Sequence, residues 1–408
     1  MFTKLGQIIA VALAIHIGGQ IPVAAQTPEP GNWPAVLDQA RGQTVYWHAW
    51  GGDPRINDFI EWLGETAQAR HGVRVQQVKL ASTSDAVTRV LSERAAGQDS
   101  GGAVDLIWIN GGNFAAMKSA DLLFGPFAEA LPNWRYVDVA GKPAVVNDFT
   151  VPTDGLESPW AMAQLVFEHD SARLPNPPKS AAALLEWARA NPGRFTFPQP
   201  PDYLGTTFLK QILIGLIADP RVLQAPVDPA QYTAQVAPLW RYLDDLTPHL
   251  WRSGRAFPAN EPALAQLLAD GEIALSFAFN PGRASAAIAD GQLPDTVRSF
   301  VWQDGTIGNA SFVAIPYNAA HQAGALVVAN LLLDPEVQAR AADPNVLGFQ
   351  TVLNMEALDP VARARFDDLD LGIATLAPAD LGPSLLEPHP SWMEQIAKDW
   401  SLRYGIAQ

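Results

Sequence analysis

The chain has 408 residues, enough for two ordinary domains, and its 48% hydrophobic and 17% charged residues describe a globular protein with a sizeable core. A formal net charge of −15 without basic tracts disfavours contact with phosphate backbones, so we expect no nucleic-acid binding. The absence of cysteine excludes disulfides, thiolate metal sites, cysteine nucleophiles and a lipid-modified N-terminal cysteine.

The N-terminus has the pattern of an export signal. Lys4 supplies a short positive region, residues 5–17 are apolar, and Val23-Ala24-Ala25 fits a small-residue cleavage site. The apolar run is too short for a comfortable transmembrane helix. We therefore predict that residues 1–25 are a signal peptide and that the mature protein, starting at Gln26, is soluble in the periplasm.

The first part of the mature chain alternates strand and helix patterns. Strands are expected at residues 43–49, 73–80 and 104–109, with a helix after each. The third is the clearest, because a short apolar run ends at Asn110-Gly111-Gly112-Asn113 before a helical pattern begins. This order predicts a parallel sheet covered by helices, with ligands at the carboxyl ends of its strands.

The pattern changes after a proline- and glycine-rich break at residues 149–159. A long strand is expected at 160–169, and shorter strands are expected at 194–198, 271–277, 296–302 and 312–316. Helical patterns cover 181–190, the segment from about 208 to 216, 232–246, 263–268, 319–342 and 391–404. Together with the length, this change favours two domains over one.

Four segments, in this order and spacing, resemble the periplasmic solute-binding proteins of ABC importers, of the extracellular family 1 type and its YnjB-type branch. They are Trp47–Gly52, Val104–Asn113, Gly271–Leu275, and Ala310–Pro316 with the Leu332–Glu336 segment after it. The resemblance covers the whole mature chain. It implies an α/β fold, a two-lobed periplasmic binding protein of type II, with a ligand cleft between the lobes and hinge strands crossing near 159–166 and 298–304.

The resemblance also implies a domain division and a function. Lobe 1 would comprise residues 26–158 plus 303–345, and lobe 2 residues 159–302 plus 346–408. The protein would be a monomeric substrate-binding component of an ABC importer that captures a small-molecule ligand by hinge closure and delivers it to a permease in the inner membrane. No catalysis, cofactor or metal ion is expected.

Loop ends from both lobes are expected to converge on the cleft and bind the ligand. The residues are Trp50, Gly51, Gly52, Asn110, Gly111, Gly112 and Asn113 from the first lobe, Trp160 from the hinge side, Asp202, Tyr203, Gly205, Thr206, Thr207, Phe279 and Asn280 from the second lobe, and Asn309 and Ser311 near the second crossing. Trp50 either stacks on a ligand or belongs to the core. Trp108, in the middle of a strand, is expected to pack.

The charge of the ligand depends on three acidic residues. Asp53, Asp202 and Asp304 each follow a predicted strand end. If two of them face the cleft, a cationic ligand such as an amine or a thiamine-like compound is favoured. If none does, the glycine-rich helix starts favour an anion or a neutral polar solute. The sequence leaves both open.

Two other functions remain as alternatives. A periplasmic hydrolase would need two cleft carboxyl groups about 5–10 Å apart. A sensory binding protein would present its ligand to a membrane receptor instead of a permease. The sequence contains no Gly-x-Ser-x-Gly elbow, no P-loop and no His-Glu-x-x-His pair, which favours binding over catalysis.

Overall fold

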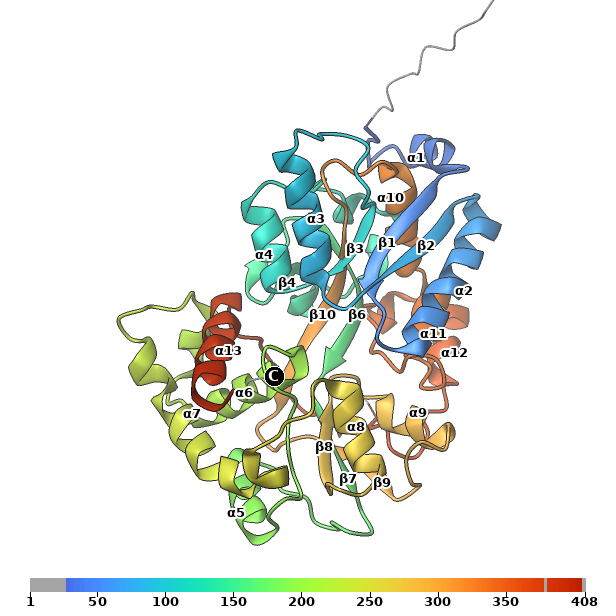
Figure 1. Cartoon of the computed structure of the whole chain (residues 1–408). Helices are drawn as coiled ribbons and strands as arrows, with labels where there is room; N and C mark the ends of the chain where they lie inside the picture. Colours follow the sequence, from blue (N-terminus) through green and yellow to red (C-terminus); the bar gives the residue numbers. More distant parts are fainter. Residues whose placement is uncertain (1–26, 378–379, 406–408) are drawn as a thin grey trace, which may run out of the picture.

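The computed structural model describes residues 27–377 and 380–405 and shows two α/β lobes stacked one above the other (Figure 1). The predicted signal peptide, residues 1–25, lies outside the described residues. The expected type II architecture is confirmed, with long strands running between the lobes in the middle of the molecule. No helix in the described part of the chain has the length and apolar character needed to cross a membrane.

The first lobe is built on a sheet with the strand order β11-β10-β3-β1-β2, in which β6 also pairs with β10. The strands are β1 (Thr44–Trp50), β2 (Arg74–Leu80), β3 (Leu106–Ile109), β6 (Glu157–Gln164), β10 (Thr306–Ala314) and β11 (Ser384–Leu385). As predicted, β1, β2 and β3 are parallel. β10 runs antiparallel to β3 and β6.

Helices cover both faces of this sheet. They are α1 (Trp33–Ala40), α2 (Pro54–His71) and α10 (Gln322–Leu332) on one face, and α3 (Thr83–Ala95) and α4 (Gly112–Ser119) on the other. Leu106 packs into the first of these cores and its neighbour Ile107 into the second. A strand buried on both faces needs apolar side chains at successive positions, which explains the unbroken apolar run of β3.

The second lobe contains a three-stranded sheet in which β7 lies between β8 and β9, antiparallel to both. Its elements are β7 (Val166–Asp170), β8 (Leu275–Ala278), β9 (Val297–Phe300), α5 (Ala181–Ala190), α6 (Tyr203–Leu216), α7 (Tyr232–Leu246), α8 (Glu261–Ala269), α9 (Arg283–Ala289) and α13 (Pro390–Tyr404). A separate apolar core joins these elements.

Short elements complete the described chain. The hairpin of β4 (Asn147–Asp148) and β5 (Val151–Pro152) lies at the edge of the first lobe. Helices α11 (Pro335–Ala342) and α12 (Pro360–Asp367) follow α10. The 3-10 helices are Ala128–Ala130, Pro132–Tyr136, Pro143–Val146, Pro220–Gln224, Thr247–His249, Trp251–Gly254 and Met355–Ala357.

Three details of the predicted strands are wrong. Residues 160–169 do not form one strand: β6 ends at Gln164, β7 starts at Val166, and the two belong to different sheets. Residues 194–198 form no strand, because their carbonyls accept only isolated hydrogen bonds, from Ala274 and Trp251. β10 begins at Thr306, ahead of the strand expected at 312–316.

The chain after α10 contributes to both cores. Leu347, Val352 and Leu358 are buried in the first core, whereas Ala374 and Trp392 are buried in the second. The predicted division gave all of residues 346–408 to lobe 2, and the exact lobe boundaries stay a prediction.

Candidate functional site

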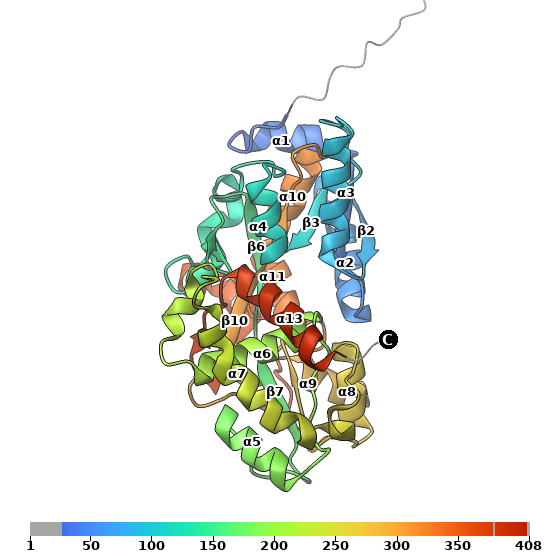
Figure 2. The ribbon, with the colours of Figure 1, turned by 60° about the vertical axis from the view of Figure 1, so that its left-hand side comes forward.

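The two lobes face each other across the ends of several elements. β1 and β3 end at the lower edge of the first lobe, above the starts of α6, α8 and α9 in the second (Figure 1). Contacts already join the lobes there. Arg55 of α2 forms an ion pair with Asp290 and donates to the Ala286 carbonyl at 3.1 Å. In Figure 2, α13 lies across the front of this junction, with its Glu394 beside Gly112 at the start of α4.

Three acidic residues at this junction come from both lobes, and the charges of two of them act on the third. We call them the rim cluster: Asp53, Asp202 and Glu261. Asp53 caps α2, Asp202 caps α6, and Glu261 is the first residue of α8. Burial, and then the negative charges of Asp202 and Asp53, raise the pKa of Glu261 to about 8. Its side chain is still 29% exposed, so a ligand can reach this carboxyl group.

One guanidinium group lies beside the rim cluster but is engaged elsewhere. Arg283 forms a bidentate ion pair with the fully buried Glu168, and its Nε lies 3.9 Å from Glu261. Burial lowers the pKa of Arg283 to about 10. Neither Asp53 nor Asp202 forms an ion pair with any lysine or arginine of the described chain. The rim cluster therefore keeps an excess of negative charge.

The helix starts at the junction already have acceptors for their N–H groups. Asp202 Oδ1 accepts from Leu204 and Gly205 at 3.0 and 3.1 Å, and Asp53 Oδ1 accepts from Arg55 at 2.8 Å. Beside the start of α4, Gly111 donates to Asp148 at 2.6 Å. A bound anion would have to compete with these carboxylates, so the helix starts do not favour an anionic ligand.

A second group of charged residues lies deeper, beside the hinge strands, and we call it the hinge cluster: Lys210, Glu387, Tyr203, Asn309 and Phe149. Lys210 Nζ lies 2.5 Å from Glu387 Oε2, and both side chains are buried. Glu387 Oε1 accepts from the Tyr203 hydroxyl and from Asn309 Nδ2, each at 3.2 Å. The Lys210 ammonium lies 4.8 Å from the centre of the Phe149 ring. In the hinge cluster, the Glu387 carboxylate is therefore neutralised by Lys210.

Two more buried carboxyl groups lie near the hinge cluster. Asp148 and Glu157 are 1% and 0% exposed. Burial raises the pKa of each well above its ordinary value, and the charge of Glu387 adds to the effect on Asp148. Asp148 Oδ1 and both oxygens of Glu157 have no hydrogen-bond partner among the described residues. Burial without a cation therefore favours the protonated form of both groups.

Half-buried aromatic rings lie next to the rim cluster. A side chain at Gly52 would come within 2.4 Å of the Trp50 ring, so the glycine allows the indole to fold back over the loop that leads to Asp53. Tyr203 follows Asp202 and meets Phe279 edge to face at 5.5 Å. Trp50 and Tyr203 are thus close in the chain to Asp53 and Asp202, and Phe279 packs against Tyr203.

Several predicted site residues are buried within the lobes, and their contact with a ligand stays a prediction. Trp160 is 1% exposed and packs against Trp47, Phe59, Trp108 and Phe349 in the first core.

Thr206 and Thr207 are fully buried, and their hydroxyls donate to the carbonyls of Asp202 and Tyr203 within α6. Ser311 is 8% exposed within β10. A side chain at Gly205 would come within 2.0 Å of the Pro198 carbonyl oxygen, so this glycine permits close packing.

The other predicted residues hold the loops in place or lie at their ends. Asn280 donates to the Leu347 carbonyl and accepts from the Gly282 N–H, so it joins the lobes. A side chain at Gly51 would meet Lys79. The loop residues Asn110, Gly112 and Asn113 lie at the start of α4, and Asn309 belongs to the hinge cluster. Asp304 is exposed in a turn.

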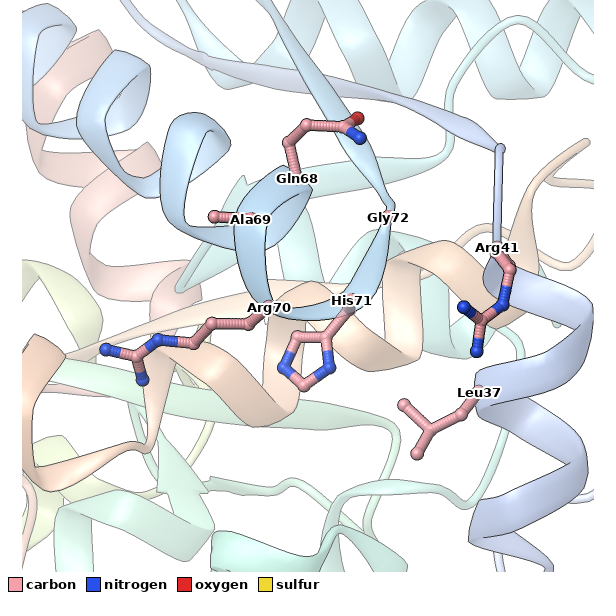
Figure 3. Close-up of a pocket in the computed structure, with 7 residues that line it drawn as sticks. All are labelled: Leu37, Arg41, Gln68, Ala69, Arg70, His71 and Gly72. Carbon is pink, nitrogen blue, oxygen red and sulfur yellow. The ribbon is translucent and has the colours of Figure 1, made fainter.

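Two cavities lie outside the rim cluster. One, of about 320 Å³, lies on the first lobe between α1 and the end of α2, where Arg41, Arg70 and His71 surround it (Figure 3). The other, of about 280 Å³, lies beside the hinge cluster and is lined by Phe149, Asn309 and Glu387 among others. Nowhere in the described ranges are three His, Asp or Glu side chains grouped to hold a metal ion.

Comparison with known proteins gives a consistent result. The family model of the bacterial extracellular solute-binding proteins matches residues 62–362. Protein YnjB of Escherichia coli (strain K12) is 44% identical over 387 residues, which cover 95% of this chain and 97% of YnjB.

Solved structures agree at the level of the fold. The spermidine/putrescine ABC transporter substrate-binding protein PotD from Streptococcus pneumoniae has a TM-score of 0.57 and 16% identity, over 89% of this chain and 98% of that one. The periplasmic binding protein AfuA from Actinobacillus pleuropneumoniae, with fructose-6-phosphate bound, has a TM-score of 0.59 and 14% identity, over 90% and 99%.

Proposed function

Because the chain belongs to the bacterial extracellular solute-binding proteins, we propose that it captures a cationic amine in the periplasm for an ABC permease. A family of solute-binding proteins does not favour the hydrolase alternative. The family implies a place outside the cytoplasmic membrane, and the proposal adds the periplasm, the permease partner and the charge of the ligand.

The charge of the ligand is inferred from the rim cluster. Asp53 comes from the first lobe, and Asp202 and Glu261 come from the second, so moving the lobes together concentrates like charges. That repulsion helps to raise the pKa of Glu261 to about 8. A bound ammonium group would replace repulsion with attraction, and closure would then be favourable only around a cation.

The names of the similar structures support an amine without deciding it. PotD is named for spermidine and putrescine, whereas AfuA holds fructose-6-phosphate on the same fold. The fold therefore accommodates ligands of either charge. In this chain the helix starts at the junction are paired with carboxylates, which supports the cationic class.

The aromatic rings beside the rim cluster would complete the site. An ammonium group over Trp50 or Tyr203 gains about 0.5–2 kcal/mol from the ring face. Micromolar affinity corresponds to a binding free energy of about −8 kcal/mol, to which these rings and the rim carboxylates would both contribute. Thiamine-like compounds, which carry a cation on an aromatic ring, belong to the same class.

A thermal-shift screen tests the proposal. The panel contains aliphatic and aromatic amines, thiamine, sugars, amino acids and oxyanions, and a bound ligand raises the melting temperature. We expect amines or thiamine to stabilise the protein and oxyanions to leave it unchanged. Stabilisation by sugars or oxyanions alone would contradict the cationic class.

A further inference from the structure

We propose that the cavity of about 280 Å³ beside the hinge cluster is a second ligand site, and that it binds a small neutral carboxamide with an apolar body. We call it the hinge cavity. Asp53, Asp202 and Glu261 do not line it, so its occupant is distinct from the amine proposed for the rim cluster.

The walls of the hinge cavity come from both lobes and from a strand that runs between them. Asn147 and Phe149 belong to the first-lobe segment before β6, and Gln224 ends the 3-10 helix Pro220–Gln224 of the second lobe. Asn309 belongs to β10, and Glu387 lies in the segment before α13. An occupant therefore contacts both lobes and a strand that joins them.

Three amide side chains line the hinge cavity, and each bonds to the protein through its NH₂ group. Asn309 Nδ2 donates to Glu387 Oε1 at 3.2 Å, and Gln224 Nε2 donates to the Glu387 carbonyl at 3.3 Å. Asn147, at an exposed position, donates to the Pro143 carbonyl at 3.0 Å. Because only the nitrogen of an amide can donate, these bonds fix the position of each amide oxygen.

The oxygens of these three amides are free to accept. No donor in the described part of the chain bonds to them. They are also not among the fully buried side-chain atoms that lack a partner, so each keeps some access to the cavity or to solvent. The hinge cavity therefore presents several hydrogen-bond acceptors to a guest.

Two of these acceptors are held by the same residue, because Asn309 and Gln224 both bond to Glu387. An –NH₂ group carries two N–H donors on one nitrogen, whereas a hydroxyl group carries one. A guest with an –NH₂ group can therefore satisfy both oxygens from a single position. In a carboxamide this group is uncharged.

The charge and polarity of the lining favour a neutral guest with an apolar body. Among the described residues that line the cavity, Glu387 alone is charged, and Lys210 neutralises it. A guest with a net charge would lose hydration there without gaining an opposite charge. Phe149 and the 59% exposed Leu386 offer apolar surface. The volume lies just below the range of about 300–1,000 Å³ of typical ligand sites, so the guest must be compact.

Benzamide is the probe that matches this lining, and methyl benzoate is its counterpart without N–H donors. In titrations followed by saturation-transfer NMR, wild type should bind benzamide more tightly than methyl benzoate, by about fivefold or more. Benzoate tests a carboxylate and xylitol tests separate hydroxyl groups, and both should bind more weakly than benzamide. No saturable binding of benzamide, or equal or tighter binding of any of the other compounds, would overturn the proposal.

Two variants test whether benzamide binds in the hinge cavity. Ala144→Leu adds bulk to its wall and should weaken benzamide binding by about tenfold or more. Ala130→Leu, at an exposed position of another 3-10 helix, should leave it unchanged. Gln224→Met removes one acceptor and should reduce the preference for benzamide over methyl benzoate to about twofold or less. An unchanged preference in Gln224→Met, which also decides the outcome if Ala144→Leu does not fold, would overturn the site, as would unchanged affinity in a folded Ala144→Leu protein.

Discussion

The rim cluster and the hinge cluster are both groups of carboxylates between the lobes, but their charge is balanced in opposite ways. In the hinge cluster the buried Glu387 accepts hydrogen bonds from Tyr203 and Asn309 and pairs with Lys210 at 2.5 Å. In the rim cluster, the carboxylates of Asp53 and Asp202 accept only from backbone N–H groups among the described residues, and Glu261 lies 3.9 Å from an arginine held by Glu168.

This difference distinguishes carboxylates that are neutralised within the fold, in the hinge cluster, from carboxylates that remain available to a ligand, in the rim cluster. A buried carboxylate without a cation would be costly, so the hinge cluster supplies one from the chain. The residues of the rim cluster remain partly exposed, and burial, followed by the charges of Asp202 and Asp53, raises the pKa of Glu261. A site that needs a cation and lacks one within the chain is suited to receive it from solution.

The largest expected effect comes from removing the internal cation. Lys210→Met leaves Glu387 buried without its partner, and breaking a buried pair in this way costs about 3–5 kcal/mol. Urea unfolding should show this loss, and adding Glu387→Gln to the variant should restore part of it. A loss below about 1 kcal/mol would mean that the hinge cluster is not balanced by Lys210.

A substitution in the rim cluster should change the affinity for the ligand and leave the stability of the fold intact. At pH 9, where Glu261 is ionised, Glu261→Gln removes one attracting charge and one source of repulsion, so affinity for a cationic ligand should fall about ten- to a hundredfold, equivalent to about 1.4–2.7 kcal/mol. The free energy of unfolding should stay the same or rise. Calorimetric titration measures the affinity, and urea unfolding measures the free energy of unfolding. Glu129→Gln, at an exposed position, is the control. Unchanged affinity would remove Glu261 from the site.

The aromatic neighbour of the rim cluster should matter less. Trp50→Ala should weaken binding by about tenfold or more, or about 1.4 kcal/mol, because the cation loses the face of the indole. Circular dichroism should show an intact fold, since the indole is only partly buried. Unchanged affinity in Trp50→Ala would mean that Trp50 packs in the core and does not contact the ligand.

The smallest expected effect is that of pH. Glu261 has a folded-state pKa of about 8, above its ordinary value of 4.5. The folded protein therefore holds more protons than the unfolded chain between these values, and the stability of the free protein falls as pH rises through this window. Affinity for a cation should instead rise, by at most about tenfold between pH 7 and 9, with proton release on binding. Calorimetry in two buffers of different ionisation enthalpy measures the released proton, and zero release would exclude coupling.

Sequence patterns predicted the architecture where local signals are strong. The apolar run of β3 and the glycine turn at Gly111 indicated a strand, a turn and a helix, and all are present. The boundary between β6 and β7 was missed because only Leu165 separates the two strands. Periodicity cannot show that neighbouring strands enter different sheets.

The site was only partly accessible to sequence reasoning. Asp202, Tyr203 and Phe279 follow recognisable helix starts and strand ends, so their positions could be predicted. Glu387 and Lys210 are 177 residues apart, and neither belongs to a local pattern. Glu261, after the capping Asn260, reads as an ordinary first-turn residue of a helix. Trp160 was assigned to the site from its place on the hinge side, and the sequence does not show that its ring packs into the first core.

The most direct measurement compares an amine with its neutral counterpart. The amine that stabilises the protein most strongly is titrated into wild type and into Asp53→Asn/Asp202→Asn, alongside the analogue in which a hydroxyl replaces the ammonium group. Tight binding of the amine to wild type alone, with weak binding of the hydroxyl analogue to both proteins, is the expected result. Equal affinity of wild type for the amine and the alcohol, or unchanged affinity in the double variant, would contradict a cation site between the lobes.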